Sequence, residues 1–196
     1  SWPATPGRLS TYAHDLETTQ YCSRNFRLLI DFLAQHTDAR EIHLIGHSAG
    51  TRIVCNALKE LRLVHATADE NALRAKLKIG HVILIGADFD RMIVKSYYRD
   101  NILDLLRKVT IYLSGRDRAL QFSRFLFKGV RLGELEKRHL SPLEMKVLSQ
   151  ETKVDIIDAT TARKSTRGSG HLYHLTSPWI SSDIIRCLKN NLPPQE

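Results

Sequence analysis

Short apolar runs alternate along the chain with longer segments that are mostly amphipathic. The short runs cover residues 42–45, 82–85, 109–113 and 154–157. Predicted helices fill the longer segments, which are 10–35, 50–63, 67–78, 91–107, 118–128, 141–150 and a last helix from 177 onward. Apolar residues at a period of 3.6 indicate helices, whereas short β-branched runs indicate buried strands. The pattern therefore predicts strands and helices in alternation.

The predicted strands are apolar on both faces, which is typical of parallel strands covered by helices on each side. Strand and helix in alternation imply right-handed crossovers in an α/β fold. Ser177 as N-cap and Pro178 at the first helical position mark the start of the last helix. No repeat or linker divides the sequence. We therefore expect a single α/β domain over residues 1–196, with a mostly parallel sheet and helices on both faces.

Composition narrows the kinds of partner. No apolar run approaches the roughly 18 residues that span a bilayer, so no transmembrane segment is expected. The formal net charge is +8, with much of the excess between Arg91 and Arg138, and such a surface could attract an anionic partner. No nucleic-acid motif accompanies the charge, so no specific nucleic acid is expected. The three cysteines lack the spacing of a zinc site, and neither a metal nor an organic cofactor is expected.

The candidate chemistry begins at a G-x-S-x-G motif formed by residues 46–50. The motif follows a predicted buried strand and opens an amphipathic helix, which is the context of a nucleophile elbow. Ser48 would then be a strained nucleophile, with Gly46 and Gly50 as the small neighbours that the turn requires. The amide of Ala49 would point into an oxyanion hole at the helix N-terminus.

A serine nucleophile needs a base, and in this kind of fold the acid and then the histidine follow the serine along the chain. Of the nine histidines, only His171 and His174 follow the last predicted strand. His171 lies in a small-residue loop that can carry an imidazole back over the strand ends. We expect His171 to be the base, with His174 as the alternative.

The acid should lie at the carboxyl end of a strand between the serine and the histidine. Asp117 closely follows the third predicted strand and is the expected acid. Asp88 and Asp90 follow the second strand and remain alternatives. A carboxylate at any of these positions could instead cap the next helix.

Five segments together carry a resemblance to a known family. They are Ser1-Trp2-Pro3, residues 42–50, residues 114–120 with Ser123-Arg124, residues 131–133, and Ser169-Gly170-His171. Over nearly all of its length the chain resembles a bacterial branch of the α/β-hydrolase superfamily that is filed as a domain of unknown function. The resemblance implies that fold and a serine-hydrolase triad of Ser48, Asp117 and His171. It implies no substrate.

The chain also departs from that family at its start. Family members begin earlier, with a strand and a His-Gly loop that supplies a second oxyanion donor. Here the chain begins at Ser1-Trp2-Pro3, without Met and without a visible leader peptide, so we expect it to have been processed or cut from a longer sequence. It would then hold about the C-terminal two-thirds of the domain. The elbow strand would adjoin the 82–85 strand on one side and an upstream strand on the other.

These observations favour a serine hydrolase that acts on an ester or related acyl bond of a small-molecule or lipid-like substrate. The alternative is a non-catalytic hydrolase-fold scaffold that binds a partner or an anionic surface through its basic face. The arginines and lysines of residues 118–152 would border a shallow, open site. Nothing in the sequence indicates the acyl chain, the compartment or the oligomeric state.

Overall fold

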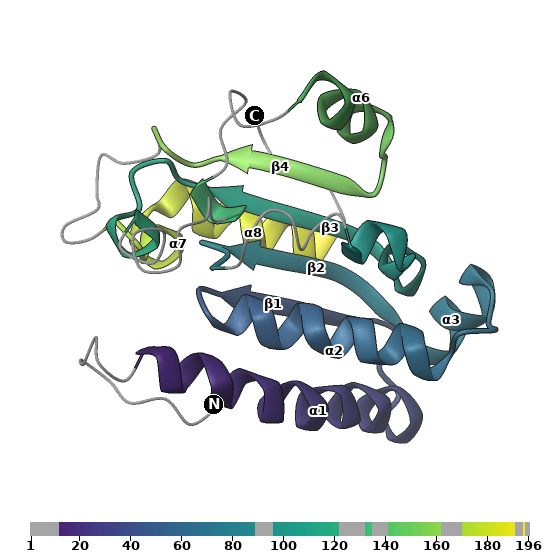
Figure 1. Ribbon diagram of the computed structural model, residues 1–196. Coiled ribbons are helices and arrows are strands. Elements are labelled where there is room, and N and C mark those ends of the chain that lie inside the picture. The colour runs from purple at the N-terminus through teal and green to yellow at the C-terminus, as the bar shows by residue number, and fades with distance from the viewer. Residues whose placement is uncertain are drawn as a thin grey trace.

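The computed structural model describes residues 12–88, 96–121, 132–134, 141–161, 170–190 and 194. Its helices and strands, in chain order, are α1 (Tyr12–His36), β1 (Ile42–His47), α2 (Gly50–Val64), α3 (Glu70–Leu77), β2 (Ile79–Ile85), the 3₁₀ helix η2 (Ile102–Leu105), β3 (Leu106–Leu113), the 3₁₀ turn η3 (Leu132–Glu134), α6 (Pro142–Gln150), β4 (Val154–Asp158), α7 (Tyr173–Thr176) and α8 (Pro178–Asn190) (Figure 1). Helical turns also cover 96–99 and 118–121.

The four strands form one parallel sheet in the order β1-β2-β3-β4. His47 is level with Ile85, Ile85 with Tyr112, and Tyr112 with Ile157. All four carboxyl ends therefore lie along one edge of the sheet, where the arrowheads point in Figure 1. This arrangement confirms the predicted α/β class with a parallel sheet.

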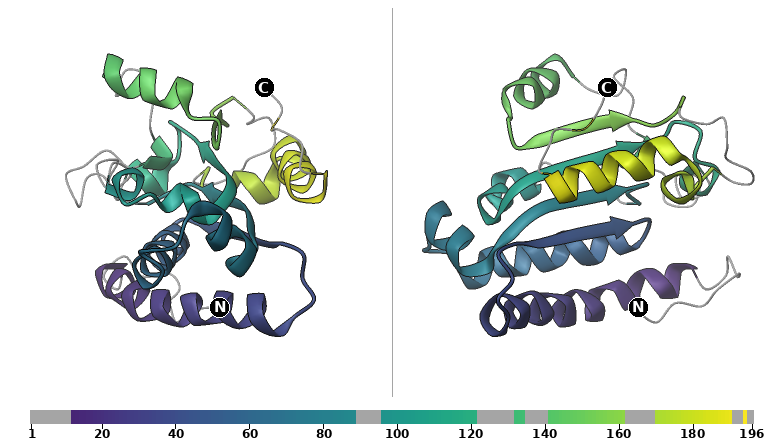
Figure 2. Two further views of the ribbon diagram at one scale, coloured as in Figure 1. Left: turned by 90° about the vertical axis from the view of Figure 1, so that its right-hand side faces the viewer. Right: turned by 180° about the vertical axis from the view of Figure 1, so that it is seen from behind.

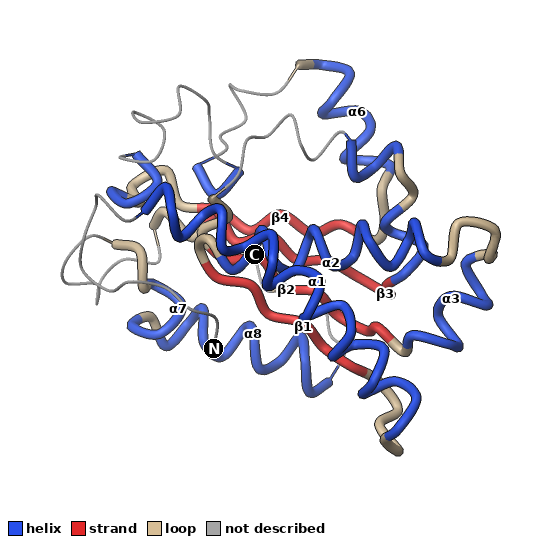
Figure 3. The backbone as a smooth tube through the Cα atoms, turned by 60° about the horizontal axis from the view of Figure 1, so that its bottom comes forward, coloured by secondary structure: helices blue, strands red, loops and turns tan. Residues whose placement is uncertain are grey.

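Helices cover both faces of the sheet. The alternating side chains of β2 show the division, because Val82 and Leu84 pack into one buried cluster and Ile83 and Ile85 into the other. The first cluster lies beneath α1, α2 and α3, and the second lies beneath α8 (Figures 2 and 3). Apolar residues on both sides of β2 are thus buried from water, which is the main favourable term in folding.

Helix α3 is shorter than the predicted segment 67–78, because local hydrogen bonds set both of its ends. The side chain of Asp69 accepts a hydrogen bond from the Ala72 amide at 2.9 Å and caps the first turn. Lys78 follows the last turn with left-handed backbone angles, and its amide donates to the Arg74 carbonyl. Strand β2 then begins at Ile79, three residues before the predicted start.

The predicted helix over 91–107 is wrong at its carboxyl end. The described part of this segment holds a helical turn at 96–99 and then η2, and β3 already begins at Leu106. Arg107 and Lys108 are the second and third residues of β3 and precede its apolar run. In the structure Arg107 pairs with Glu41 at 2.6 Å, and Lys108 pairs with Asp155 of β4 at 2.9 Å. A residue just before β1 and a residue of the neighbouring β4 thus accommodate the two charges.

Strand β1 lies at an edge of the sheet, since within the described residues it pairs only with β2. Its pairing with the 82–85 strand is as expected. The side chain of Ile45 is 51% exposed on the α8 side of this strand, whereas Leu44 on the opposite side is buried. In the described parts of the chain, every helix is too short or too polar to cross a lipid bilayer.

Candidate active site

The site is built where β1 turns into α2. Ser48 stands between the last residue of β1 and the helix with φ +53°, a left-handed conformation that costs energy for a residue with a side chain. Hydrogen bonds on both sides of the residue hold it there. The Ser48 amide donates to the Ile85 carbonyl at 2.9 Å, and the Thr51 hydroxyl donates to the Ser48 carbonyl at 2.5 Å. The sharp turn lifts the serine side chain out of the plane of the sheet.

The two glycines of the motif differ in how closely other residues pack around them. A Cβ at Gly46 would come within 3.0 Å of the Thr51 Cα and 3.2 Å of a Val54 methyl, so glycine lets the helix pack closely against the strand. Among the described residues beyond its own helical turn, a Cβ at Gly50 would meet nothing within 4 Å, so these neighbours give no packing reason for glycine at this position.

The Ala49 amide lies at the N-terminus of α2, whose buried face holds residues such as Ile53 and Ala57. Among the described residues, none accepts a hydrogen bond from this N–H. Backbone donors at a helix N-terminus also lie at the positive end of the helix dipole. The amide is thus placed to stabilise a negative charge next to Ser48.

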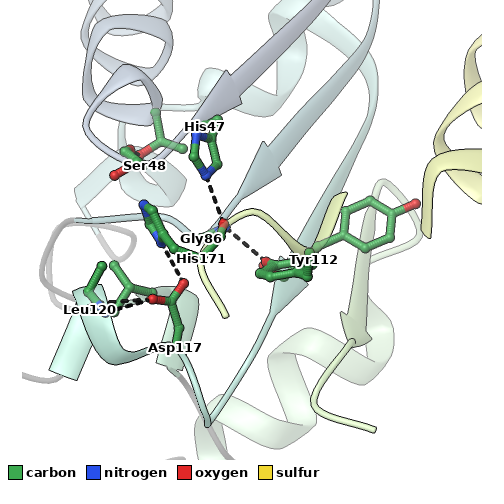
Figure 4. A network of polar contacts seen from close by, with 10 residues as sticks. His47, Ser48, Gly86, Tyr112, Asp117, Leu120 and His171 are labelled. Atoms are coloured by element: carbon green, nitrogen blue, oxygen red, sulfur yellow. Dashed lines mark hydrogen bonds and ion pairs between the residues drawn. The ribbon is translucent and has the colours of Figure 1, made fainter. Parts of the chain in front are cut away.

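Asp117 follows β3 and its side chain is fully buried. One carboxylate oxygen, Oδ1, accepts hydrogen bonds from the amides of Ala119 and Leu120 at 3.0 and 3.2 Å. The other, Oδ2, lies 2.6 Å from Nδ1 of His171. Because a carboxylate can only accept, the proton of this short bond belongs to the imidazole and Nε2 is left as the second ring nitrogen. In Figure 4 the His171 ring lies between Ser48 and Asp117.

The segment that carries His171 is held against the strand ends by a buried tyrosine. Tyr173 donates its hydroxyl to the Tyr112 carbonyl at 2.9 Å and accepts from the Gly86 amide at 3.0 Å. Gly86 itself has φ +52°, and a Cβ there would lie 3.4 Å from both Asp117 Oδ2 and the His171 ring. Tyr173 and Gly86 were not among the predicted site residues, and only their short sequence distance from His171 and from the end of β2 marks them.

The described alternative residues make other contacts. The His174 ring packs at a tilt against His47, with centroids 4.3 Å apart, whereas it is His171 that approaches Asp117. Asp88 is buried just beyond β2, where its backbone carbonyl accepts a 2.7 Å hydrogen bond from Arg52 Nε. Asp90 lies outside the described residues. Much of the basic stretch between Arg91 and Arg138 also lies outside them, as do parts of the predicted border at 118–152.

The electrostatics of the site centre on three imidazoles. Burial, together with the neighbouring His171 and His174, lowers the pKa of His47 to about 4. Burial and the nearby His171 also lower the pKa of His174. Neither histidine is therefore a strong competitor for a proton near neutral pH. Within the described ranges, no three His, Cys, Asp or Glu side chains are grouped as metal ligands.

A parallel sheet with a strained serine at a strand-helix turn and a His-Asp pair at the same edge defines an α/β-hydrolase-type domain. Comparison with family models agrees, because residues 1–188 match the model described as an alpha/beta hydrolase of unknown function (DUF900). The chain belongs to that family. No curated protein and no solved structure matches it significantly.

Proposed function

We propose that the protein is a serine hydrolase that cleaves an ester or related acyl bond of a small-molecule or lipid-like substrate. The observation that carries the proposal is the 2.6 Å contact between His171 Nδ1 and the buried Asp117 carboxylate, at the sheet edge where Ser48 is strained. Membership of the α/β-hydrolase family over residues 1–188 supports this function and supports treating the chain as one domain.

In the proposed reaction, Ser48 Oγ attacks the acyl carbon while Nε2 of His171 takes the hydroxyl proton. The resulting oxyanion is stabilised by the Ala49 amide. As the tetrahedral intermediate collapses, the bond to the leaving group breaks and His171 returns the proton to that group. An acyl-Ser48 ester remains. Water then attacks this ester, with His171 as base again, and the acid product leaves as Ser48 regains its proton.

Asp117 has two tasks in this scheme. Its Oδ2 fixes the His171 tautomer with the proton on Nδ1, so that the lone pair of Nε2 is the one that accepts the proton from Ser48. The negative charge also stabilises the imidazolium that forms during the reaction. The two hydrogen bonds that backbone amides donate to Oδ1 hold the carboxylate in one orientation without neutralising its charge. Burial strengthens both effects, because the surrounding dielectric is low.

A fluorophosphonate probe on the full chain tests the proposal. We expect the probe to label the wild-type protein, with peptide mass spectrometry locating the adduct at Ser48. Ser48→Ala should abolish labelling, while Ser149→Ala, which changes an exposed serine of α6, should label normally. Either a folded wild-type chain that does not react or labelling that persists in Ser48→Ala would contradict the proposal.

A further inference from the structure

His47 joins the nucleophile turn to the segment that carries His171. Its Nε2 lies 3.1 Å from the backbone carbonyl of His171, which is 124 positions away in the sequence. Its ring packs between two others, with centroids 4.6 Å from His171 and 4.3 Å from His174. Figure 4 shows the His47 ring pointing from the end of β1 toward His171. This contact connects the residues on which the proposed reaction depends.

The chemistry of the contact determines the protonation of His47. A backbone carbonyl can only accept, so Nε2 of His47 must carry the proton and donate it. His47 is also level with Ile85 in the sheet, and the next residue, Ser48, donates its amide to the Ile85 carbonyl. His47 is therefore fixed at its backbone by the sheet and at its ring by the loop. Any shift of the His171 backbone relative to Ser48 would stretch this bond.

We propose that His47 is a positioning residue, whose Nε2–H holds the His171 backbone so that the imidazole stays aligned between Ser48 and Asp117. The proposal rests on the proposed serine-hydrolase function, but the alignment itself is a property of the resting protein. His47 does not touch the reacting atoms in this scheme; it acts through the position of His171. Misplacement of a reacting group by about 1 Å can lower a rate by about 10²-fold, which is why such a contact matters.

The neutral state of His47 suits this task. The titratable groups that act on it are His171, His174 and Asp117, and its pKa of about 4 keeps it uncharged at neutral pH. A neutral ring beside His171 adds no repulsion when that residue becomes an imidazolium during the reaction. A permanent positive charge at position 47 would oppose that step.

Three replacements separate the hydrogen bond from the bulk of the ring. Gln carries its amide nitrogen the same number of bonds from Cβ as His Nε2, so His47→Gln can still reach the His171 carbonyl. His47→Asn has the same amide one bond shorter, and His47→Phe keeps a ring but has no donor. The matched control is His43→Phe, since His43 lies on the same side of β1 and its Nδ1 accepts a backbone hydrogen bond from His81 at 3.0 Å.

The first measurement is the NMR signal of the proton between His171 Nδ1 and Asp117 Oδ2 in the full chain, which requires no turnover. A hydrogen bond as short as 2.6 Å should place this proton far downfield. We expect the signal to persist in wild type, His47→Gln, His43→Phe and Ser48→Ala. It should shift or broaden in His47→Phe and His47→Asn.

The second measurement is hydrolysis of p-nitrophenyl acetate. We expect kcat to fall about ten- to hundredfold in His47→Phe and His47→Asn, with KM changed by no more than about twofold, because alignment and not binding is lost. His47→Gln should recover most of kcat. If His47→Phe does not fold, as judged by circular dichroism, the comparison of His47→Gln with His47→Asn still shows whether the hydrogen bond to the His171 carbonyl matters.

Two results would overturn the assignment of His47. One is that His47→Phe and His47→Asn both give the same NMR signal and the same kcat as the wild-type protein. If His47→Phe does not fold, this result in His47→Asn alone is enough. The other is an equal loss in Gln and Asn, which would show that the donor is not what matters. Failure of the hydrolase proposal looks different. In that case the wild-type chain would neither hydrolyse the ester nor react with fluorophosphonate, while the NMR signal would still respond to position 47.

Discussion

Asp117 combines two structural tasks that use different oxygens. Oδ1 caps the helical turn at 118–121, and Oδ2 binds His171. A substitution that keeps the cap and changes only the other oxygen therefore tests the chemistry without removing the fold. Asparagine meets this condition, because its carbonyl oxygen can replace Oδ1 as the acceptor.

Asp117→Asn should lower kcat for p-nitrophenyl acetate by about 10⁴-fold, the size of effect known for this substitution in serine-protease triads. The Asn amide would donate to His171 Nδ1, which forces the ring proton onto Nε2 and leaves no acceptor for the serine proton. Urea unfolding should show a change of no more than about 1 kcal/mol, because the cap survives.

Asp88→Asn is the natural companion to that experiment. It alters the other described carboxylate that the sequence offered as an acid, and its rate should stay within about threefold of wild type if Asp117 is the acid. A near-normal rate in Asp117→Asn with a collapse in Asp88→Asn would exchange the two assignments.

The histidine before the serine also predicts how stability depends on pH. His47 has a pKa of about 4 in the folded protein and about 6.5 when unfolded. Between these values the unfolded chain binds more protons, so acidification favours unfolding. The contribution of His47 to stability is complete above pH 6.5 and is lost as pH falls toward 4. Urea unfolding should therefore show a flatter pH dependence in this window for His47→Gln than for wild type.

The other described histidines whose pKa is lowered, such as His81 and His43, are present in both proteins. Their contributions cancel in the comparison. Identical slopes between pH 4 and 6.5 would mean that His47 is not held neutral by the fold.

At the scale of elements, α7 is a single short helix, yet it fixes the position of the proposed base. Its first residue, Tyr173, is buried and bridges Gly86 after β2 and Tyr112 of β3. The tyrosine hydroxyl thus connects two neighbouring strand ends with the loop that follows β4. A buried polar group that is left without a hydrogen-bond partner destabilises the fold.

Tyr173→Phe removes the hydroxyl and leaves the Gly86 amide without that partner. We expect the free energy of unfolding in urea to fall by about 1–3 kcal/mol. Tyr98→Phe, at a half-exposed tyrosine of the 96–99 turn, should change it by no more than about 0.5 kcal/mol. Equal effects in the two variants would show that the bridge contributes nothing.

The sequence was sufficient to predict the alternation of elements and the turn at Ser48, because both depend on local patterns. Short apolar runs marked β1 to β4, and the G-x-S-x-G spacing marked the turn. The start of β3 was missed, since Arg107 and Lys108 find their partners at Glu41 and Asp155, which are far away in the sequence. Local periodicity cannot reveal such partners.

The same limit applies within the site. Chain order suggested that Asp117 and His171 would meet, and the structure brings them together. No local pattern could show that His47 faces the His171 carbonyl or that Tyr173 returns to Gly86. These contacts join segments through the fold. They supply the positioning of the site, whereas the motifs supplied its reactive groups.

At the scale of the whole molecule, β1 presents an exposed apolar side chain, and on one side its backbone has no strand partner among the described residues. Exposed apolar edges of this kind favour pairing with another chain. Ile45→Lys should therefore reduce self-association of the full chain in sedimentation velocity experiments. The melting temperature should stay close to that of wild type, since Ile45 is 51% exposed.

Ile185→Lys provides the control, because it introduces the same charge at a side chain that is 59% exposed but belongs to α8 and not to β1. Net charge changes equally in the two variants. If both reduce association to the same degree, general repulsion is responsible, and the edge of β1 has no special part.

The sheet order also has a consequence for the order in which the strands and the site can form during synthesis. Each strand pairs with the one before it in the sequence, so the sheet can extend strand by strand while the chain is being synthesised. His171 and Tyr173 come after the last strand and return to the ends of β2 and β3. A growing chain would therefore display Ser48 long before its partner emerges. In the proposed reaction, chemistry at that serine would begin only after residues 171–173 have been synthesised and have returned to the ends of β2 and β3.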